Sequence, residues 1–220
     1  MVPAIMADSV TRAGDRHATT AILDYVNRVH AAHDAGLARA FEVPDGIPAI
    51  QISPSDGKLL ELLLRLVRAA RVVELGTLVG YSAIHIARAL APGGHLWSIE
   101  YDPRHAEVGR ANLAAAGVGD RVTVLVGAGR SVLPTLGGHA PFDAVFIDAD
   151  KVSYDHYGQW AIEHLRPGGL VLGDNAYLFG ELMDDSDRGR AMRSFHEQVA
   201  KSCDSVCIPT PDGLVVGIKR

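Results

Sequence analysis

The sequence of 220 residues contains only two cysteines, Cys203 and Cys207. Two thiols alone cannot form a disulfide framework or a four-ligand zinc site, so we expect both to be reduced in a cytoplasmic protein. No apolar run approaches the roughly 20 residues that a membrane-spanning helix needs. The opening residues, MVPAIMADSV, also lack the basic and apolar regions of a signal peptide. We therefore expect neither export nor a membrane partner.

The sequence also lacks an excess of basic residues. It has 21 Lys and Arg against 26 Asp and Glu, a net charge of −5, which argues against nucleic acid as the main partner. Apolar residues make up 48% and charged residues 21%, as in ordinary globular proteins. The length suits one domain, and no repeat or linker interrupts it. We predict a single domain over residues 1–220.

Strand patterns alternate with helix patterns after about Ile50. Such alternation is typical of βαβ units, which form a mostly parallel sheet with helices on both faces. Near the end, two apolar stretches flank Asp212-Gly213, which predicts a hairpin and one antiparallel strand. Before Ile50 the pattern is helical, and we expect the apolar stripe of residues 20–33 to face the core. The expected class is α/β, with five strands at 71–75, 94–100, 121–127, 142–148 and 168–174, two more in the hairpin, and helices at 80–90, 103–117 and 154–165.

Carboxylates gather where the predicted strands end. Ligands of open parallel sheets bind outside the carboxyl ends of the strands. Four of the five strands carry an acid at that end, namely Glu74, Glu100, Asp148 and Asp174. A purely structural sheet has no need for this arrangement, so we interpret this edge as functional.

A glycine-bearing turn, VELGTLVGYS, follows the first predicted strand. Gly76 and Gly80 allow a ligand to approach the backbone closely. Their G-x-x-x-G spacing lacks the middle glycine of the dinucleotide fingerprint. Glu100, at the end of the next strand, can accept both hydroxyls of a ribose. These features favour S-adenosylmethionine, which has a ribose but no phosphate. An NAD-dependent oxidoreductase is the alternative, and the missing glycine argues against it.

A second set of polar residues, Asp148, Asp174 and Asn175, follows two other strands. Two carboxylates and one amide oxygen are hard ligands that suit Mg²⁺ or another divalent cation such as Mn²⁺ or Ca²⁺. They leave three of six octahedral positions for two adjacent substrate oxygens and a water. The structural alternative is that these residues only cap loops.

Lys151 lies three residues after Asp148, in the stretch VFIDADK. An ammonium group near a divalent cation should have a pKa well below its ordinary value of about 10.4. A neutral lysine could then accept the proton of a substrate hydroxyl. A solvated surface charge is the alternative, but the position beside the predicted cation favours a catalytic base.

The sequence resembles the cation-dependent, S-adenosylmethionine-dependent O-methyltransferases, which include the catechol and caffeoyl-CoA enzymes and their small bacterial relatives. The resemblance runs from about Ile50 to the C-terminus and rests on VVELGTLVGYSA, SIEYDP, VFIDADKVSY, RPGGLVLGDN and PDGL. It implies a class I methyltransferase fold, Rossmann-like, with residues 1–47 as a helical cap or dimer segment and 48–220 as the core that binds donor and metal. It also implies methyl transfer to a hydroxyl of a small molecule, foremost a catechol-type vicinal diphenol, by a cytoplasmic homodimer.

The resemblance assigns roles to single positions. Leu178 and Phe179 stand where many bacterial members have a tryptophan near the substrate, and Val206 to Pro209 holds no counterpart of the glutamate at the pocket lip of the animal catechol enzyme. A non-catalytic binding module remains an alternative, and the complete Asp/Asp/Asn/Lys set argues against it. The implied donor-binding residues are Ile52, Glu74, Gly76, Thr77, Ser82, Glu100, Ala128 and Asp148; the metal ligands are Asp148, Asp174 and Asn175; and the base is Lys151.

Overall fold

The computed structural model describes residues 19–220. The first 18 residues, which include the stretch considered above for a signal peptide, lie outside the described residues. The chain divides into two compact units, residues 1–32 and 33–220, and each is described by itself. In residues 19–220, no helix is both long enough and apolar enough to span a membrane.

Helix α1 (Thr20–His30) is the described helix of the first unit. It begins after Thr19, whose hydroxyl accepts the N–H of Ile22 at 3.4 Å. The helix contains no buried residue, and Ile22 and Val29 are 48% and 53% exposed. The prediction that its apolar stripe faces a core is therefore wrong for this unit. Among the residues of this unit that the structure describes, 19–32, no second element covers that stripe.

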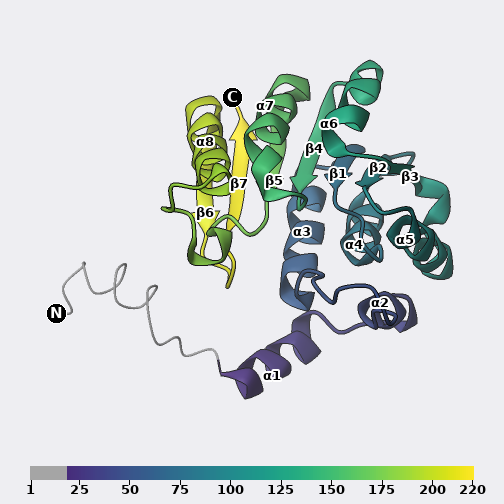
Figure 1. Ribbon diagram of the computed structural model, residues 1–220. Helices are drawn as coiled ribbons and strands as arrows, with labels where there is room; N and C mark the ends of the chain where they lie inside the picture. Colours follow the sequence, from purple (N-terminus) through teal and green to yellow (C-terminus); the bar gives the residue numbers. More distant parts are fainter. Residues whose placement is uncertain (1–18) are drawn as a thin grey trace. The chain divides into compact units, whose positions relative to one another are not determined.

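The second unit is built on one sheet of seven strands among the described residues, in the order β3-β2-β1-β4-β5-β7-β6 (Figure 1). Neighbours from β3 to β5 are parallel, and β7 runs antiparallel to both β5 and β6. This confirms the predicted α/β class, with a mostly parallel sheet and a C-terminal hairpin. The strands are β1 (Arg71–Leu75), β2 (His95–Glu100), β3 (Val122–Val126), β4 (Phe142–Ile147), β5 (Leu165–Gly173), β6 (Cys203–Ile208) and β7 (Leu214–Lys219).

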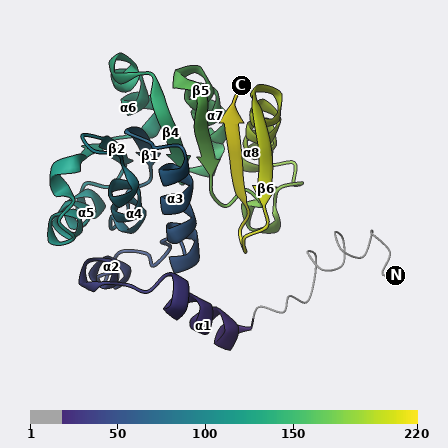
Figure 2. The ribbon, with the colours of Figure 1, turned by 180° about the vertical axis from the view of Figure 1, so that it is seen from behind.

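Helices cover both faces of the sheet, as the two opposite views show (Figures 1 and 2). Neighbouring strand residues alternate between the faces, because successive side chains of a strand point in opposite directions. Thus Val72 belongs to the core under α2 to α5, and Val73 to the core under α7 and α8. The helices of this unit are α2 (Ala35–Phe41), α3 (Pro54–Leu66), α4 (Tyr81–Ala89), α5 (Pro103–Ala115), the short α6 (Gly129–Val132), α7 (Tyr154–His164) and α8 (Asp187–Ser202).

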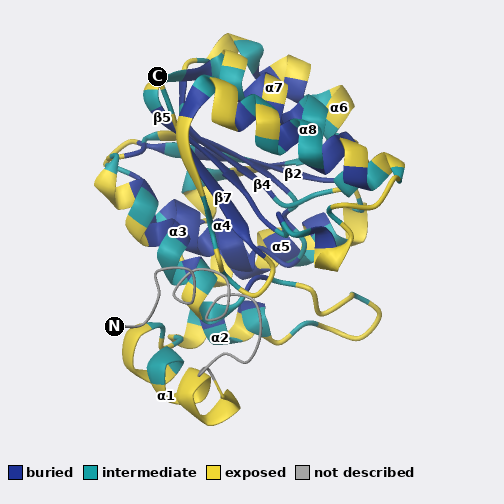
Figure 3. Cartoon of the chain, turned by 90° about the vertical axis from the view of Figure 1, so that its left-hand side faces the viewer, coloured by how far each residue is buried: buried dark blue, intermediate teal, exposed yellow. Residues whose placement is uncertain are grey.

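The central strands lie buried between the two helical layers (Figure 3). In β4, five of six residues are buried, which explains its continuous apolar sequence. Polar residues begin where these strands end: Asp148 follows β4 and Asp174 follows β5.

Local sequence explains where the helices begin. Asp102 caps α5 through the N–H of Arg104 at 2.8 Å, and Pro103 occupies the first turn, where its missing N–H costs nothing. Helix α4 differs, because its N-cap is Gly80, in the left-handed region (φ 84°), and no side chain caps it. Its first backbone N–H groups are thus left for another acceptor.

Glycine at position 173 lets α8 pack directly against β5. A Cβ there would lie 2.6 Å from two ring atoms of Phe195, a fully buried residue of α8. We expect Gly173→Ala to lower the free energy of unfolding by about 1–3 kcal/mol, because overpacking forces the ring to move. Urea denaturation measures this change.

Gly138→Ala is the matched control, since Gly138 is exposed and a Cβ there would meet nothing within 4 Å. We expect it to change stability by less than about 0.5 kcal/mol. Equal effects of the two substitutions would contradict the packing argument.

Candidate active site

The carboxyl ends of the central strands open into a cavity of about 810 Å³. The structure brings most of the predicted site residues together around it. Two of them, Glu74 and Asp174, are buried beside the cavity and do not line it. The predicted residues that do line it are Ile52, Gly76, Thr77, Ser82, Glu100, Ala128, Asp148, Lys151 and Asn175.

Gly76 joins the donor side of the cavity to the predicted metal side. Its φ is +99°, in the region that favours glycine. A Cβ at this position would lie 1.9 Å from the carbonyl oxygen of Asp148. The turn after β1 therefore packs directly against the end of β4, and no residue other than glycine fits there.

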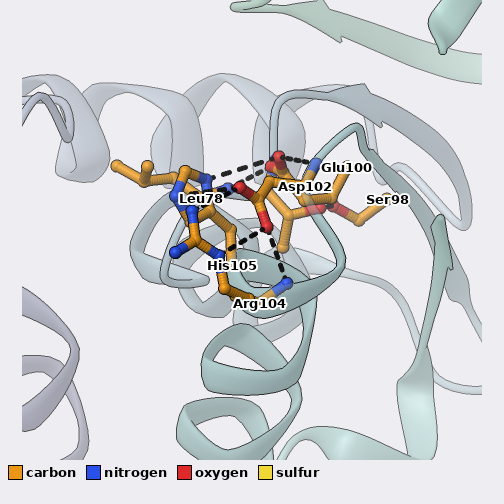
Figure 4. Close-up of polar contacts among 7 residues, drawn as sticks. Leu78, Ser98, Glu100, Asp102, Arg104 and His105 are labelled. Atoms are coloured by element: carbon orange, nitrogen blue, oxygen red, sulfur yellow. Dashed lines mark hydrogen bonds and ion pairs between the residues drawn. The ribbon is translucent and has the colours of Figure 1, made fainter. Parts of the chain in front are cut away.

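Glu100 is bonded to the backbone of two loops (Figure 4). Its Oε2 accepts the N–H groups of Thr77 at 3.1 Å and Leu78 at 2.8 Å. Its Oε1 accepts the N–H of Asp102 at 2.9 Å. The residue is 7% exposed and still lines the cavity. Glu100 thus holds the turn after β1 in place, in addition to its predicted role at the ribose.

Glu74 is fully buried below the cavity. It accepts hydrogen bonds from the hydroxyls of Ser82 at 2.6 Å and Ser98 at 2.5 Å. Burial raises the pKa of its carboxyl to about 7, and the charges of Asp148 and Glu100 act in the same direction. Through Ser82, which lines the cavity, Glu74 positions one wall of the site.

Lys151 lies beside the predicted metal ligands, in the short 3₁₀ turn Lys151–Ser153 that precedes α7. Its Nζ donates to Oδ1 of Asp148 at 3.1 Å and to the hydroxyl of Tyr154 at 2.9 Å. The buried Tyr154 hydroxyl lies 2.9 Å from the carbonyl of Ile147 and 2.8 Å from that of Asp174. The amine is therefore fixed next to both predicted metal-binding strand ends.

Asp148 and Asp174 follow neighbouring strands at the same level, since Ile147 and Gly173 are register partners. The pKa of Asp174 is raised to about 7, mainly by burial and then by the charge of Asp148. A cation bound here would offset both effects, so the donor set suits a hard divalent ion. In residues 19–220 no group of three or more His, Cys, Asp or Glu side chains could hold a metal. Such a site needs the amide oxygen of Asn175, which also lines the cavity.

Comparison with known proteins places this geometry in a family. The O-methyltransferase family profile matches residues 36–220. The chain belongs to the O-methyltransferase family. The catechol O-methyltransferase of Niastella koreensis is 41% identical over 206 residues, which cover 93% of this chain and 91% of that protein. The catechol O-methyltransferase of Mycobacterium tuberculosis is 46% identical over 161 residues, 72% of this chain and 73% of the relative.

Solved O-methyltransferases share the fold. The enzyme from Bacillus cereus, in complex with SAH, has a TM-score of 0.85 at 33% identity and covers 91% of this chain and 98% of its own. TomG from Streptomyces achromogenes, in complex with SAM, has a TM-score of 0.84 at 37% identity and covers 90% and 96%. The predicted family, its class I methyltransferase fold and its enzymatic nature (EC 2.1.1 class) are thereby confirmed. Nothing in these comparisons favours an oxidoreductase or a binding module.

Three residues of this O-methyltransferase site were missed by sequence reasoning. Ser98 lies two residues before Glu100 on β2. Because alternate residues of a strand point to the same side, the strand pattern could have placed Ser98 beside Glu100. Tyr154 lies three residues after Lys151, the spacing of one helical turn. His105 lines the cavity from α5 and had no comparable signal, because only folding brings α5 against the end of β2.

The raised pKa of Glu74 gives a test of the site's electrostatics. Between the ordinary pKa of 4.5 and the folded value of about 7, the folded state holds more protons than the unfolded state. The free energy of unfolding therefore falls as pH rises through this window, by up to about 3 kcal/mol. Glu74→Gln removes that loss, so its stability relative to wild type should improve from pH 5 to pH 8.

Urea denaturation in EDTA at the two pH values measures the difference. Glu163→Gln, at an exposed position on α7, is the control and should show no such trend. If the free energies of unfolding of Glu74→Gln and wild type differ by the same amount at both pH values, the argument that Glu74 carries a buried charge is refuted.

Proposed function

We propose that this protein transfers the methyl group of S-adenosylmethionine to one hydroxyl of a small vicinal diphenol, in a reaction that requires a divalent cation. The proposal rests on one observation: a single cavity is lined both by predicted donor-binding residues and by predicted metal-binding and catalytic residues. The turn at Gly76 and Glu100 line one part of it, and Asp148, Lys151 and Asn175 line another. The names of the two catechol O-methyltransferase relatives support the acceptor class.

The donor end supports S-adenosylmethionine. The turn of β1 into α4 approaches the cavity with glycines at both ends, and Tyr81 and Ser82 from the uncapped first turn of α4 line it. Free N–H groups there suit a carboxylate such as that of the methionine part. The SAM and SAH bound to the solved relatives support the same ligand.

The residues at the acceptor end of the cavity favour a flat, apolar acceptor molecule. Pro48, Ile50 and Phe179 line the cavity with apolar surface. Phe179 is 60% exposed and has a φ of 55°, so its aromatic ring stands at the mouth on an unusual backbone. In the segment where many bacterial members have a tryptophan, this chain has Leu178 and Phe179, and Phe179 would offer an aromatic wall for a diphenol ring.

Asp148, Asp174 and Asn175 would hold the divalent cation. When bound, such an ion lowers the pKa of a hydroxyl that it contacts. Nζ of Lys151, in its neutral form, would take the proton of that hydroxyl. The Tyr154 hydroxyl and the Asp148 carboxylate hold Nζ in place for this task. The remaining contribution of the protein is to align the acceptor oxygen with the methyl group and to exclude water.

The proposed base is tested by Lys151→Met, which keeps the length of the side chain and removes the amine. We expect kcat for a catechol acceptor to fall by about 10²- to 10⁴-fold at pH 7. The loss should shrink at high pH, where the acceptor ionises without help. Lys58→Met is the control, because Lys58 pairs with Glu61 on α3 outside the cavity lining. A variant with wild-type turnover at pH 7 would make Lys151 a bystander.

Cation dependence is tested by Asp174→Asn together with EDTA. We expect both to abolish methyl transfer to catechol while S-adenosylmethionine affinity, measured by calorimetry, stays nearly unchanged, because Asp174 does not line the cavity. Mg²⁺ should restore the EDTA-treated wild type. Ca²⁺ should bind and support little turnover, since its longer bonds would displace the acceptor oxygen.

Asp185→Asn, at an exposed position, is the matched control and should retain full activity. Full-rate methylation by the wild type in excess EDTA would exclude the cation from the reaction. The expected homodimer remains a prediction, which light scattering in solution would test.

A further inference from the structure

The turn of the C-terminal hairpin brings a carboxylate to the acceptor end of the cavity. The N–H of Tyr177 donates to the carbonyl of Asp212 at 3.0 Å, and the N–H of Ala176 donates to that of Gly213 at 2.9 Å. These bonds tie the turn to the segment that directly follows Asn175. Asp212 itself lines the cavity. It therefore borders the same space as an acceptor held at the predicted metal ligands.

Asp212 differs from the other carboxylates that line the cavity, because each of those is bonded to a donor of the protein. Glu100 accepts three backbone N–H groups. Asp148 accepts a lysine amine, and Asp150 accepts a tyrosine hydroxyl. Within residues 19–220, no hydrogen bond or ion pair engages the carboxylate of Asp212. Its charge is thus left for solvent or for a ligand.

A second carboxylate, that of Asp56, lies near Asp212. Asp56 is in the first turn of α3, where its Oδ2 accepts the hydroxyl of Ser53 at 2.7 Å. Burial raises the pKa of Asp56, and the charge of Asp212 acts in the same direction. The two carboxylates are therefore close enough to repel each other. A cation beside them would relieve that repulsion.

The basic side chains that line the cavity do not supply this cation. Arg130 donates to the hydroxyl of Ser153, and the amine of Lys151 donates to Asp148. His105 lies at the donor end, on α5. The described part of the chain thus leaves the carboxylates of the hairpin turn and of α3 without a partner cation.

Gln51 adds another hydrogen-bond acceptor that lacks a donor. It lines the cavity between Ile50 and Ile52. Its Nε2 donates to the carbonyl of Phe41 at 2.9 Å, which fixes the orientation of the amide because a carbonyl can only accept. Its Oε1 is buried and has no hydrogen-bond partner in residues 19–220. Asp212 and Gln51 therefore both suit a ligand that brings donors.

We propose that the carboxylate of Asp212 selects diphenols whose side chain ends in an ammonium group over diphenols whose side chain ends in a carboxylate. This rests on the proposed function and names the acceptor class of that same site. An ammonium brings three N–H donors and a positive charge to the uncompensated carboxylates, whereas an anionic side chain meets like charge. Asp212 is thus a specificity residue and takes no part in methyl transfer.

The test compares three diphenols with a two-carbon spacer at the same ring position. Dopamine ends in an ammonium, dihydrocaffeate in a carboxylate and propylcatechol in a methyl group. With S-adenosylmethionine and Mg²⁺ at pH 7, kcat/KM of the wild type should be at least about tenfold higher for dopamine than for dihydrocaffeate, with propylcatechol between them. Asp212→Asn keeps the shape and removes the charge. It should reduce the dopamine-to-dihydrocaffeate ratio about three- to tenfold, as expected for one exposed charge acting on both compounds.

Asp120→Asn is the matched control, because it makes the same charge change at an exposed position outside the cavity lining. It should keep the wild-type ratio, and thermal unfolding should show that both variants are folded. A wild-type ratio near one, an unchanged ratio in Asp212→Asn, or an equal decrease in Asp120→Asn would overturn the inference, while turnover of propylcatechol leaves the proposed function intact. Failure of the wild type to methylate any of the three diphenols would instead overturn the proposed function, and this inference with it.

Discussion

The close approach of Gly76 to the carbonyl of Asp148 is the contact on which the site depends. It leaves no room for a side chain, so the turn after β1 and the end of β4 share one rigid arrangement. Glu100 then holds the next two residues of that turn through their N–H groups. Three strand ends are locked together in this way. The donor and acceptor ends of the cavity therefore keep a constant relation, which an in-line group transfer requires.

The same edge concentrates negative charge in a buried setting. Glu74 and Asp174 have pKa values raised to about 7, in both cases chiefly by burial. Such groups reduce the stability of the folded protein, and an ordinary sheet edge would not keep them. The cation of the proposed function would offset that cost at Asp174. Local violations of stability rules of this kind are expected at functional sites.

The two ends of the cavity differ in the residues that line them. The donor end has the glycine turn, the acid of β2 and the serines that support Glu74. The acceptor end carries an aromatic residue of its own, Phe179, on a backbone with positive φ. In the proposed function, this ring forms one wall of the acceptor site. Specificity is expected to depend on that wall, while the reaction depends on the strand ends.

The sequence alone was enough for the α/β class, the strands and the hairpin, because each depends on local patterns. Alternating βαβ periodicity, the proline at the start of α5 and the Asp212-Gly213 turn all act within a few residues. It also placed the acids at the strand ends, since parallel strands end at one edge. Tertiary structure alone decided the roles within that edge. That Glu100 is bound by three N–H groups, that Glu74 lies below the cavity, and that His105 stands beside Glu100 depend on contacts between distant segments. The sequence pattern also could not predict that the apolar stripe of α1 is exposed. Periodicity shows that one face of a helix is apolar, but it cannot show what covers that face.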